Sequence, residues 1–147
     1  MIDYPHHYRV AAGGEPDGDV KLTSKGLPSL ASAPPTEFGG PGDKWSPETL
    51  LVASVADCFI LTFRAIARAS KLTWTALECE AEGTLERKDR TTRFTEFVVH
   101  ATLSVPPGTD KERALRLLEK AEENCLVTSS MSAATHLEAT VNEVPGQ

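Results

Sequence analysis

Two cysteines are the residues of this chain best suited to covalent chemistry. Cys58 lies within the apolar run from Leu50 to Leu61, and Cys125 lies in the segment Asn124-Cys125-Leu126-Val127. A buried thiol packs like a small apolar group, whereas an ionised thiol attacks peroxides and disulfides. The pair could therefore be packed core thiols or a redox couple. Their distance along the chain decides nothing, because a disulfide needs Cα atoms about 5.5 Å apart in space.

A reactive Cys58 needs a group that stabilises its thiolate. The residue lies about three turns into its expected helix, beyond the positive end of the helix dipole, so a nearby cation is expected. Cys125 is expected beside the start of a short helix, where free N–H groups would favour a thiolate; a half-buried loop thiol is the alternative. Cys79 lies on the inward face of an alternating strand and is expected to be structural.

The cysteines must be positioned by the surrounding elements. The sequence predicts an N-terminal hairpin over 4–23, a proline- and glycine-rich loop over 29–45 and a central helix over 46–70. Alternating apolar residues then predict a long hairpin over 74–105, followed by a helix over 109–124 and a final strand over 136–144. This order of elements is α+β, with antiparallel sheets built from hairpins around the central helix.

The start of the central helix carries a third candidate residue. Ser46 supplies a capping hydroxyl, Pro47 suits the first helical position, and Glu48 is an acid in the positive first turn. Complementing the helix dipole is a sufficient role for Glu48 by itself. Ten residues separate Glu48 from Cys58, which puts them about 80° apart around the helix and about 15 Å apart along it. Direct contact between the two is therefore not expected.

Length and charge bound the possible functions. The chain has 147 residues, the size of one domain, and its 15 basic and 21 acidic residues give a net charge of −6. No basic cluster occurs, so we expect no nucleic-acid partner. The start lacks the pattern of a secretory signal, which predicts a cytoplasmic protein. Asp57 and Arg64 interrupt the apolar helix, which favours burial against protein over a membrane span. The four histidines form no set of metal ligands, and no metal or other cofactor is expected.

The central helix also predicts the oligomeric state. It is apolar nearly all round, which in a globular protein indicates a helix covered on every side. One short chain has few elements to cover it. We therefore expect an intertwined homodimer, in which antiparallel sheets wrap around the long central helices of two copies.

Several segments together resemble one family. They are Phe38-Gly39-Gly40-Pro41-Gly42, then Ser46-Pro47-Glu48-Thr49-Leu50-Leu51, then Asp57-Cys58-Phe59, and finally Asn124-Cys125-Leu126-Val127. This combination resembles the OsmC/Ohr family of thiol-dependent organic hydroperoxide reductases and spans almost the whole chain. The resemblance implies an obligate swapped dimer with active sites at the subunit interface.

The resemblance also implies residue roles. Cys58 would be the peroxidatic cysteine, Cys125 the resolving cysteine, and Glu48 the carboxylate that holds an arginine beside the peroxidatic sulfur. The arginine is where this sequence departs from the family, because Gly13-Gly14 is followed by Glu15 and the loop before the helix has Glu37 and Phe38 at the equivalent place. Arg9 is the leading replacement, and the other candidate cations are Arg64, Arg93 and Lys44.

The sequence thus predicts an enzyme, a thiol-dependent peroxidase. Cys58 would attack an organic (alkyl or lipid) hydroperoxide, become a sulfenate and form a disulfide with Cys125, and an external dithiol would restore both thiols. The resemblance implies a lipoylated protein as a candidate reductant. The alternative is an OsmC-like protein that binds a ligand or senses redox state without peroxidase turnover. A plain structural dimer would leave the cysteine pair and the helix start as coincidences.

Overall fold

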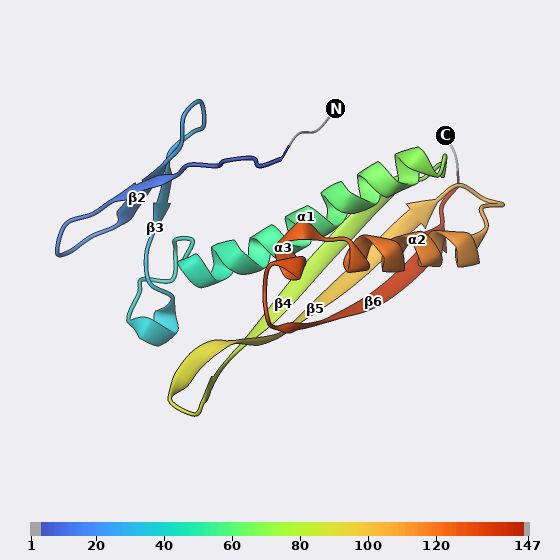
Figure 1. The fold of residues 1–147 in the computed structure, drawn as a ribbon. Coiled ribbons are helices and arrows are strands. Elements are labelled where there is room, and N and C mark those ends of the chain that lie inside the picture. Colours follow the sequence, from blue (N-terminus) through green and yellow to red (C-terminus); the bar gives the residue numbers. More distant parts are fainter. Residues whose placement is uncertain (1–3, 146–147) are drawn as a thin grey trace. The chain divides into compact units, whose positions relative to one another are not determined.

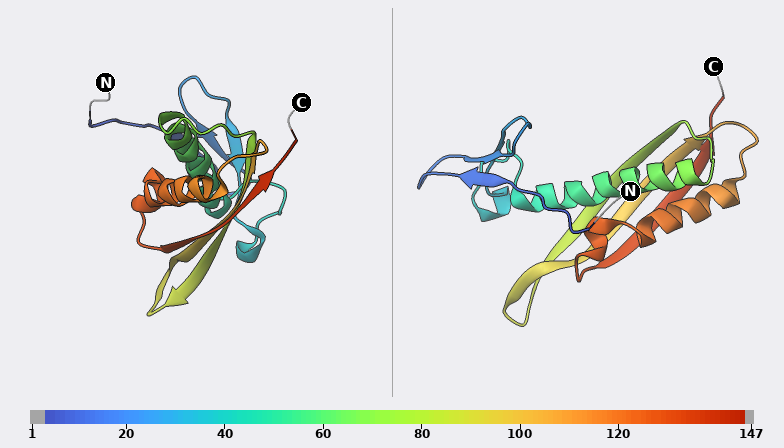
Figure 2. Two further views of the ribbon diagram at one scale, coloured as in Figure 1. Left: turned by 90° about the vertical axis from the view of Figure 1, so that its right-hand side faces the viewer. Right: turned by 45° about the horizontal axis from the view of Figure 1, so that its top comes forward.

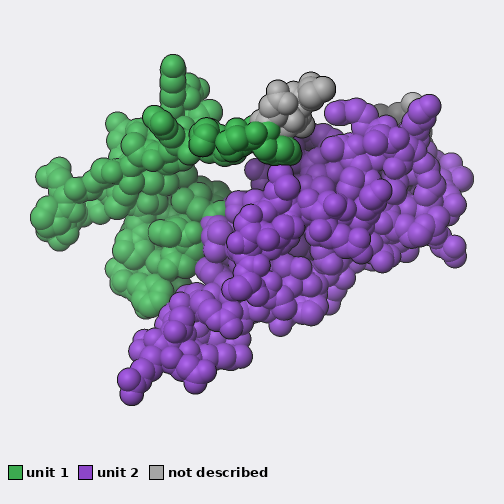
Figure 3. All heavy atoms as spheres, in the orientation of Figure 1, with its two compact units in different colours: residues 1–50 green, residues 51–147 purple. Residues whose placement is uncertain are grey.

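The structure is a computed structural model that describes residues 4–145. The elements follow in the order β1 (Ala11–Gly13), β2 (Val20–Thr23), β3 (Leu30–Ser32), the 3₁₀ helix η1 (Thr36–Phe38), α1 (Pro47–Ala69), β4 (Ala76–Lys88), β5 (Thr91–Val105), α2 (Lys111–Glu123), α3 (Leu126–Ser129) and β6 (Ala134–Glu143) (Figure 1). The fold is α+β. The chain divides into two compact units, residues 1–50 and 51–147 (Figure 3), and a single domain stays a prediction.

The first unit contains a small antiparallel sheet in the order β1-β2-β3. Ala12 pairs with Leu22, which in turn pairs with Leu30. The structure differs here from the sequence prediction in two ways. The hairpin predicted over 4–23 has its first strand only at Ala11–Gly13, and the expected loop over 29–45 contains β3 and η1. Within β3 itself there is no proline, since Pro28 precedes it and Pro34 follows it, so the β3 amides remain free to pair.

Helix α1 starts at the residues that the sequence indicates. The Ser46 hydroxyl accepts a hydrogen bond from the Thr49 amide at 3.1 Å, and the Thr49 hydroxyl accepts one from the Ser46 amide at 2.8 Å. This reciprocal pair satisfies two of the amides that every helix start leaves free. Pro47 occupies the first helical position, where its missing N–H costs nothing. The predicted start of the central helix is confirmed.

In the second unit α1 buries one stripe of its surface. Val55, Phe59, Phe63 and Ala67 follow at intervals of four residues and are fully buried. The other side is open, and Leu61 keeps 51% of its surface exposed. By length and composition α1 could cross a membrane, and 22% of its most apolar stretch is buried in the chain. The buried stripe packs against protein, whereas the expectation that α1 does not span a membrane stays a prediction.

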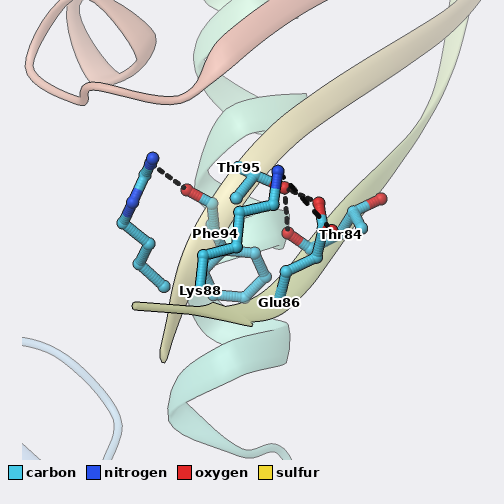
Figure 4. Close-up of polar contacts among 6 residues, drawn as sticks. Thr84, Glu86, Lys88, Phe94 and Thr95 are labelled. Atoms are coloured by element: carbon cyan, nitrogen blue, oxygen red, sulfur yellow. Dashed lines mark hydrogen bonds and ion pairs between the residues drawn. The ribbon is translucent and has the colours of Figure 1, made fainter. Parts of the chain in front are cut away.

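Strands β4 and β5 form the expected long antiparallel hairpin, with one bulge near its tip. Thr84 pairs with Glu96 whereas Leu85 pairs with Phe94, so Thr95 is an extra residue on β5. The Thr95 hydroxyl donates to the Thr84 carbonyl at 3.5 Å and also to the Glu86 carboxylate (Figure 4). The bulge leaves Thr95 without a partner residue on β4, and these two hydrogen bonds tie its side chain to that strand instead.

Strand β6 joins the other side of β5 in parallel, giving a mixed sheet in the order β4-β5-β6. The sequence predicted antiparallel sheets, and this pairing is the exception. A parallel neighbour needs a long crossover, which α2 and α3 supply. Asp110 caps α2 by accepting a hydrogen bond from the Arg113 amide at 3.1 Å. Figure 2 shows α2 and the part of α1 beyond residue 50 on the same face of this sheet.

The core of the second unit lies between these helices and the sheet. Its fully buried members are the α1 stripe together with Phe97, Leu103 and Val105 of β5 and Ala114, Leu118 and Ala121 of α2. Gly83 of β4 is tightly enclosed by α1 and β5, because a Cβ atom there would be 2.9 Å from side-chain atoms of both Val52 and Phe97. The packing of α1 on this sheet therefore leaves no room for a side chain at residue 83.

Candidate functional site

The site forms where α1 faces the segment between α2 and α3. Cys58 is half-buried on α1, and Cys125 is the N-cap residue of α3 with 2% of its surface exposed. The two residues are distant in sequence, but the crossover from β5 to β6 brings the α3 start to the middle of α1. Both are free thiols. The structure thus brings together the two cysteines that the sequence selected.

Cys58 opens into a groove with a volume of about 600 Å³. The groove is largely apolar, and Leu61 and Leu126 are exposed along it, Leu126 by 73% of its surface. The remaining residues that line it are Ser54, Asp57, Thr62, Ala65, Asn124 and Val127. A small apolar molecule with one reactive polar group would fit this surface.

The surroundings of Cys58 favour its thiolate. Burial is the largest single influence and raises the pKa, but several hydrogen bonds together outweigh it, so the pKa of Cys58 lies below its ordinary value. In order of size the donors are the Val127 amide, the Cys125 thiol, the Thr62 hydroxyl and the Leu126 amide. All of them are neutral groups. Among residues 4–145 no charged side chain contributes to this lowering.

The pKa of Cys125 is shifted in the opposite direction, upward. Burial raises its pKa above the ordinary value, and the adjacent Cys58 raises it further, while the amide and hydroxyl of Thr128 lower it only in part. The sequence placed Cys125 correctly at a helix start, and the Thr128 amide there does lower its pKa as expected, but burial outweighs this effect and the pKa is raised overall. The first amides of α3 lie against Cys58. Of the two thiols, Cys58 therefore has the lower pKa and the greater tendency to ionise.

Glu48 lies in the first turn of α1, as predicted, and within the first unit it lines an apolar cavity of about 480 Å³. Pro34, Pro35 and Phe38 are among the other lining residues. The Oε1 atom of Glu48 is buried, and it has no hydrogen-bond partner among the residues that the structure describes. A carboxylate oxygen in this state would accept a donor brought by another molecule. Its assignment to a catalytic role stays a prediction.

The candidate cations are spread over both units. Arg9 lines a shallow surface hollow together with Tyr8 and Lys25, and its carbonyl accepts the Ser24 hydroxyl at 2.8 Å. Within the described part of the first unit Arg9 forms no ion pair with Glu48, and Lys44 is paired with Asp19 at 3.8 Å. The role predicted for Arg9 beside Cys58 stays a prediction.

The two other candidate cations belong to the second unit. Arg64 is exposed on α1, and Arg93 donates to the Phe94 carbonyl at 3.5 Å near the hairpin tip. Neither contributes to the pKa of Cys58. The thiolate stabilisation seen in the second unit therefore comes from hydrogen-bond donors and not from these arginines.

The third cysteine is set apart by its environment. Cys79 is half-buried on the inner side of β4, and burial, with a smaller contribution from the charge of Cys125, raises its pKa to about 11. Such a thiol is almost fully protonated at neutral pH. Cys79 is therefore suited to packing, in line with the sequence-based expectation.

Sequence reasoning missed three donors of the site. Thr62 lies one helical turn after Cys58, and its Oγ1 is 3.8 Å from the Cys58 Sγ. This i,i+4 spacing was visible in the sequence and places both side chains on one face of the helix. The amides of Leu126 and Val127 left no such signal, because the fold alone brings α3 to α1. No group of three metal-ligating side chains occurs within residues 4–145.

Comparisons with known proteins agree with this fold. A family model described as OsmC-like protein matches residues 40–140, which include both cysteines of the site. The uncharacterized protein YmaD of Bacillus subtilis is 23% identical over 137 residues, covering 90% of this chain and 91% of YmaD.

Two solved structures extend the comparison. An OsmC-like protein of unknown function from Vibrio cholerae has a TM-score of 0.85 at 14% identity, covering 92% of this chain and 100% of that chain. The organic hydroperoxide resistance protein OsmC of Legionella pneumophila has a TM-score of 0.74 at 26% identity, covering 95% of this chain and 99% of that chain. The likeness therefore spans nearly the full length of the molecule.

Proposed function

Because this chain belongs to the OsmC-like protein family, we propose that it reduces organic hydroperoxides to alcohols through Cys58 and Cys125. The observation that carries the proposal is the contact between two thiols whose pKa values are shifted in opposite directions. The pKa of Cys58 is lowered and that of Cys125 is raised, and the Cys125 thiol donates to Cys58. A nucleophile and a protonated partner within reach of one another are what a two-cysteine peroxidase requires.

The proposed reaction has three steps. The Cys58 thiolate attacks the distal peroxide oxygen, the O–O bond breaks, and the alkoxide leaves as an alcohol after taking a proton; Cys58 becomes a sulfenic acid. The Cys125 sulfur then attacks the Cys58 sulfur, which forms the disulfide and releases water. An external dithiol finally reduces the disulfide and is itself oxidised. These steps use no metal, flavin or haem.

The groove at Cys58 supports organic substrates over hydrogen peroxide. Its apolar wall, in which Leu61 and Leu126 are exposed, offers hydrophobic contact to an alkyl or lipid chain. Hydrogen peroxide has no such chain and gains nothing from that surface. The reductant in this proposal is a dithiol, with a lipoylated protein as one candidate, and the protein acts in the cytoplasm.

We further propose that the working unit is a homodimer. Proteins of this family are typically dimeric. The open side of α1, where Leu61 is exposed, needs an apolar cover, and a second copy of the chain can supply it. Glu48 and Arg9 enter the proposal here, because a buried carboxylate oxygen without a partner would accept an arginine of the other copy. Neither nucleic acid nor a membrane has a part in this function.

Mass spectrometry after treatment with an equimolar amount of cumene hydroperoxide tests the proposed chemistry. We expect a Cys58–Cys125 disulfide in the wild-type protein and a sulfenate on Cys58 in the Cys125→Ser variant. The Cys79→Ser variant is the matched control and should behave like the wild type. Absence of both the disulfide and the sulfenate would rule out Cys58 as the peroxidatic residue.

A second candidate function is supported by the departure of the sequence from the family. No cation occupies either of the two expected places, since Glu15 follows Gly13-Gly14 and Glu37 precedes Phe38. The protein could then bind a ligand or sense redox state without turnover. Steady-state peroxide consumption with dithiothreitol separates the two functions. A peroxidase consumes peroxide far faster than dithiothreitol alone, whereas a protein that only binds a ligand or senses redox state adds little to that background rate.

A further inference from the structure

Among residues 4–145, no positively charged side chain contributes to the lowered pKa of Cys58. Among the residues that line the groove, the one ionisable side chain besides the cysteine is Asp57, which is negative. A neighbouring carboxylate disfavours a thiolate. The hydrogen-bond donors around Cys58 nevertheless lower its pKa overall. Among these donors, Thr62 is the one side chain that belongs to the same helix as Cys58.

The geometry of Thr62 suits a donor to sulfur. Its Oγ1 lies 3.8 Å from the Cys58 Sγ, and its side chain is half-buried at the wall of the groove. A helical threonine often spends its hydroxyl on a carbonyl of the preceding turn. Within residues 4–145 the Thr62 hydroxyl makes no such bond, so its proton is free for the sulfur.

The protonation state of the sulfur decides the direction of this bond. A neutral Cys58 thiol can donate to the Thr62 oxygen or accept from it. Once Cys58 has lost its proton, only the Thr62 hydroxyl can donate, and the bond gains strength from the negative charge. Thr62 therefore stabilises the thiolate more than the thiol. The β-branched side chain has few allowed rotamers in a helix, which keeps the hydroxyl in place.

We propose that Thr62 is a positioning residue whose hydroxyl donates to the Cys58 thiolate and holds the sulfur toward the groove, a role that neutral donors fill in this chain. This inference rests on the proposed function for its meaning in catalysis. Its physical content, the hydrogen bond to the thiolate, can be measured without any peroxide.

The test compares variants that remove or keep the hydroxyl. Thr62→Val keeps the branched shape without the hydroxyl, and Thr62→Ser keeps the hydroxyl. The rate of Cys58 alkylation by iodoacetamide is followed against pH by peptide mass spectrometry, which gives the pKa of Cys58 in the otherwise unchanged protein. Thr62→Val should raise that pKa by about one unit, and alkylation well below the pKa should slow about tenfold. Thr62→Ser should stay close to the wild type.

Ser54 provides a matched control on the same helix. It lines the same groove one turn before Cys58, but its hydroxyl already donates to the Leu51 carbonyl at 2.6 Å. Ser54→Ala should therefore leave the pKa of Cys58 unchanged. An unchanged pKa in Thr62→Val, or an equal rise in Thr62→Ser and Thr62→Val, would overturn the proposal. If Thr62→Val does not fold, Thr62→Ala takes its place in the same comparison.

The outcome is separable from that of the proposed function. Iodoacetamide reports on the thiolate whether or not the protein turns over peroxide. If the wild-type protein consumes no peroxide but Thr62→Val raises the pKa of Cys58, the peroxidase function is refuted and the role of Thr62 stands. If the wild-type protein turns over peroxide but Thr62→Val leaves the pKa of Cys58 unchanged, the peroxidase function stands and the role of Thr62 is refuted.

Discussion

The two thiols of the site differ in their affinity for a proton, and this difference sets an order of reactivity. The pKa of Cys58 is lowered by the Val127 amide, the Cys125 thiol and the other donors, although burial opposes them. The pKa of Cys125 is raised, first by burial. Since only the thiolate alkylates, the rate at Cys58 should reach half of its maximum at a lower pH than the rate at Cys125.

Peptide mass spectrometry after brief iodoacetamide treatment at neutral pH checks this order, with Cys58 expected to be modified first. Cys125→Ala removes one donor and should move the Cys58 titration to higher pH. A Cys125 that alkylates ahead of Cys58 would reverse the assignment of nucleophile and partner.

Cys79 should take no part in the chemistry. Its pKa of about 11, caused mainly by burial, leaves about one thiol in ten thousand ionised at pH 7. We therefore expect Cys79→Ala to keep the wild-type rate of peroxide consumption within about twofold, at some cost in stability from the lost packing. A disulfide between Cys79 and Cys125 after peroxide treatment would contradict this expectation.

At the scale of elements, Gly83 controls how closely α1 packs on the sheet. A Cβ atom there would lie 2.9 Å from Val52 and from Phe97, and 3.1 Å from Phe94. Gly83→Ala should therefore overpack the core and lower the free energy of unfolding by about 1–3 kcal/mol in urea denaturation. Gly13→Ala is a suitable control, because an added Cβ there meets nothing within 4 Å. Equal stability of the two variants would show that α1 can shift to make room.

Elements with a regular local pattern could be predicted from the sequence, and those that depend on distant partners could not. The capping residue Ser46 and the alternation along β4 and β5 are local signals, and each is confirmed. The short strand β3 escaped prediction because its pairing with β2 outweighs the weak local preference of three residues. The parallel pairing of β6 with β5 has no sequence signal of its own, since it follows from the crossover.

The same division applies to the site. The residue types and the helical context of Cys58 and Cys125 pointed to a redox pair, and the spacing of Thr62 was readable in principle. The contact between the α3 start and α1 was not, because it joins segments that only the packed sheet brings together. The sequence therefore points to arginines as the source of thiolate stabilisation, whereas the structure supplies backbone amides and hydroxyl or thiol donors.

At the scale of the whole molecule, the open side of α1 predicts self-association. Leu61 is 51% exposed on a helix whose opposite stripe is fully buried. We expect sedimentation equilibrium at micromolar concentration to give about twice the chain mass of 15.9 kDa. Leu61→Lys should shift the protein toward the monomer, because a charge would be buried at the contact.

Thr91→Lys is the matched control for the dimer prediction. It adds the same charge at an exposed position near the tip of the β4–β5 hairpin, where no apolar surface needs cover. This variant should sediment like the wild type. A wild-type protein that sediments as a single chain at this concentration would exclude the dimer.

The position of Cys125 on the crossover between β5 and β6 has a consequence for heat stability. A bond to Cys58 would tie α1 to that crossover and close a loop of roughly 67 residues, which by chain-entropy reasoning adds about 4 kcal/mol to the stability of the folded state. The melting temperature should therefore rise on treatment with peroxide and fall again with dithiothreitol, and Cys58→Ser should show neither change. The melting temperature would then report what fraction of the protein carries the disulfide.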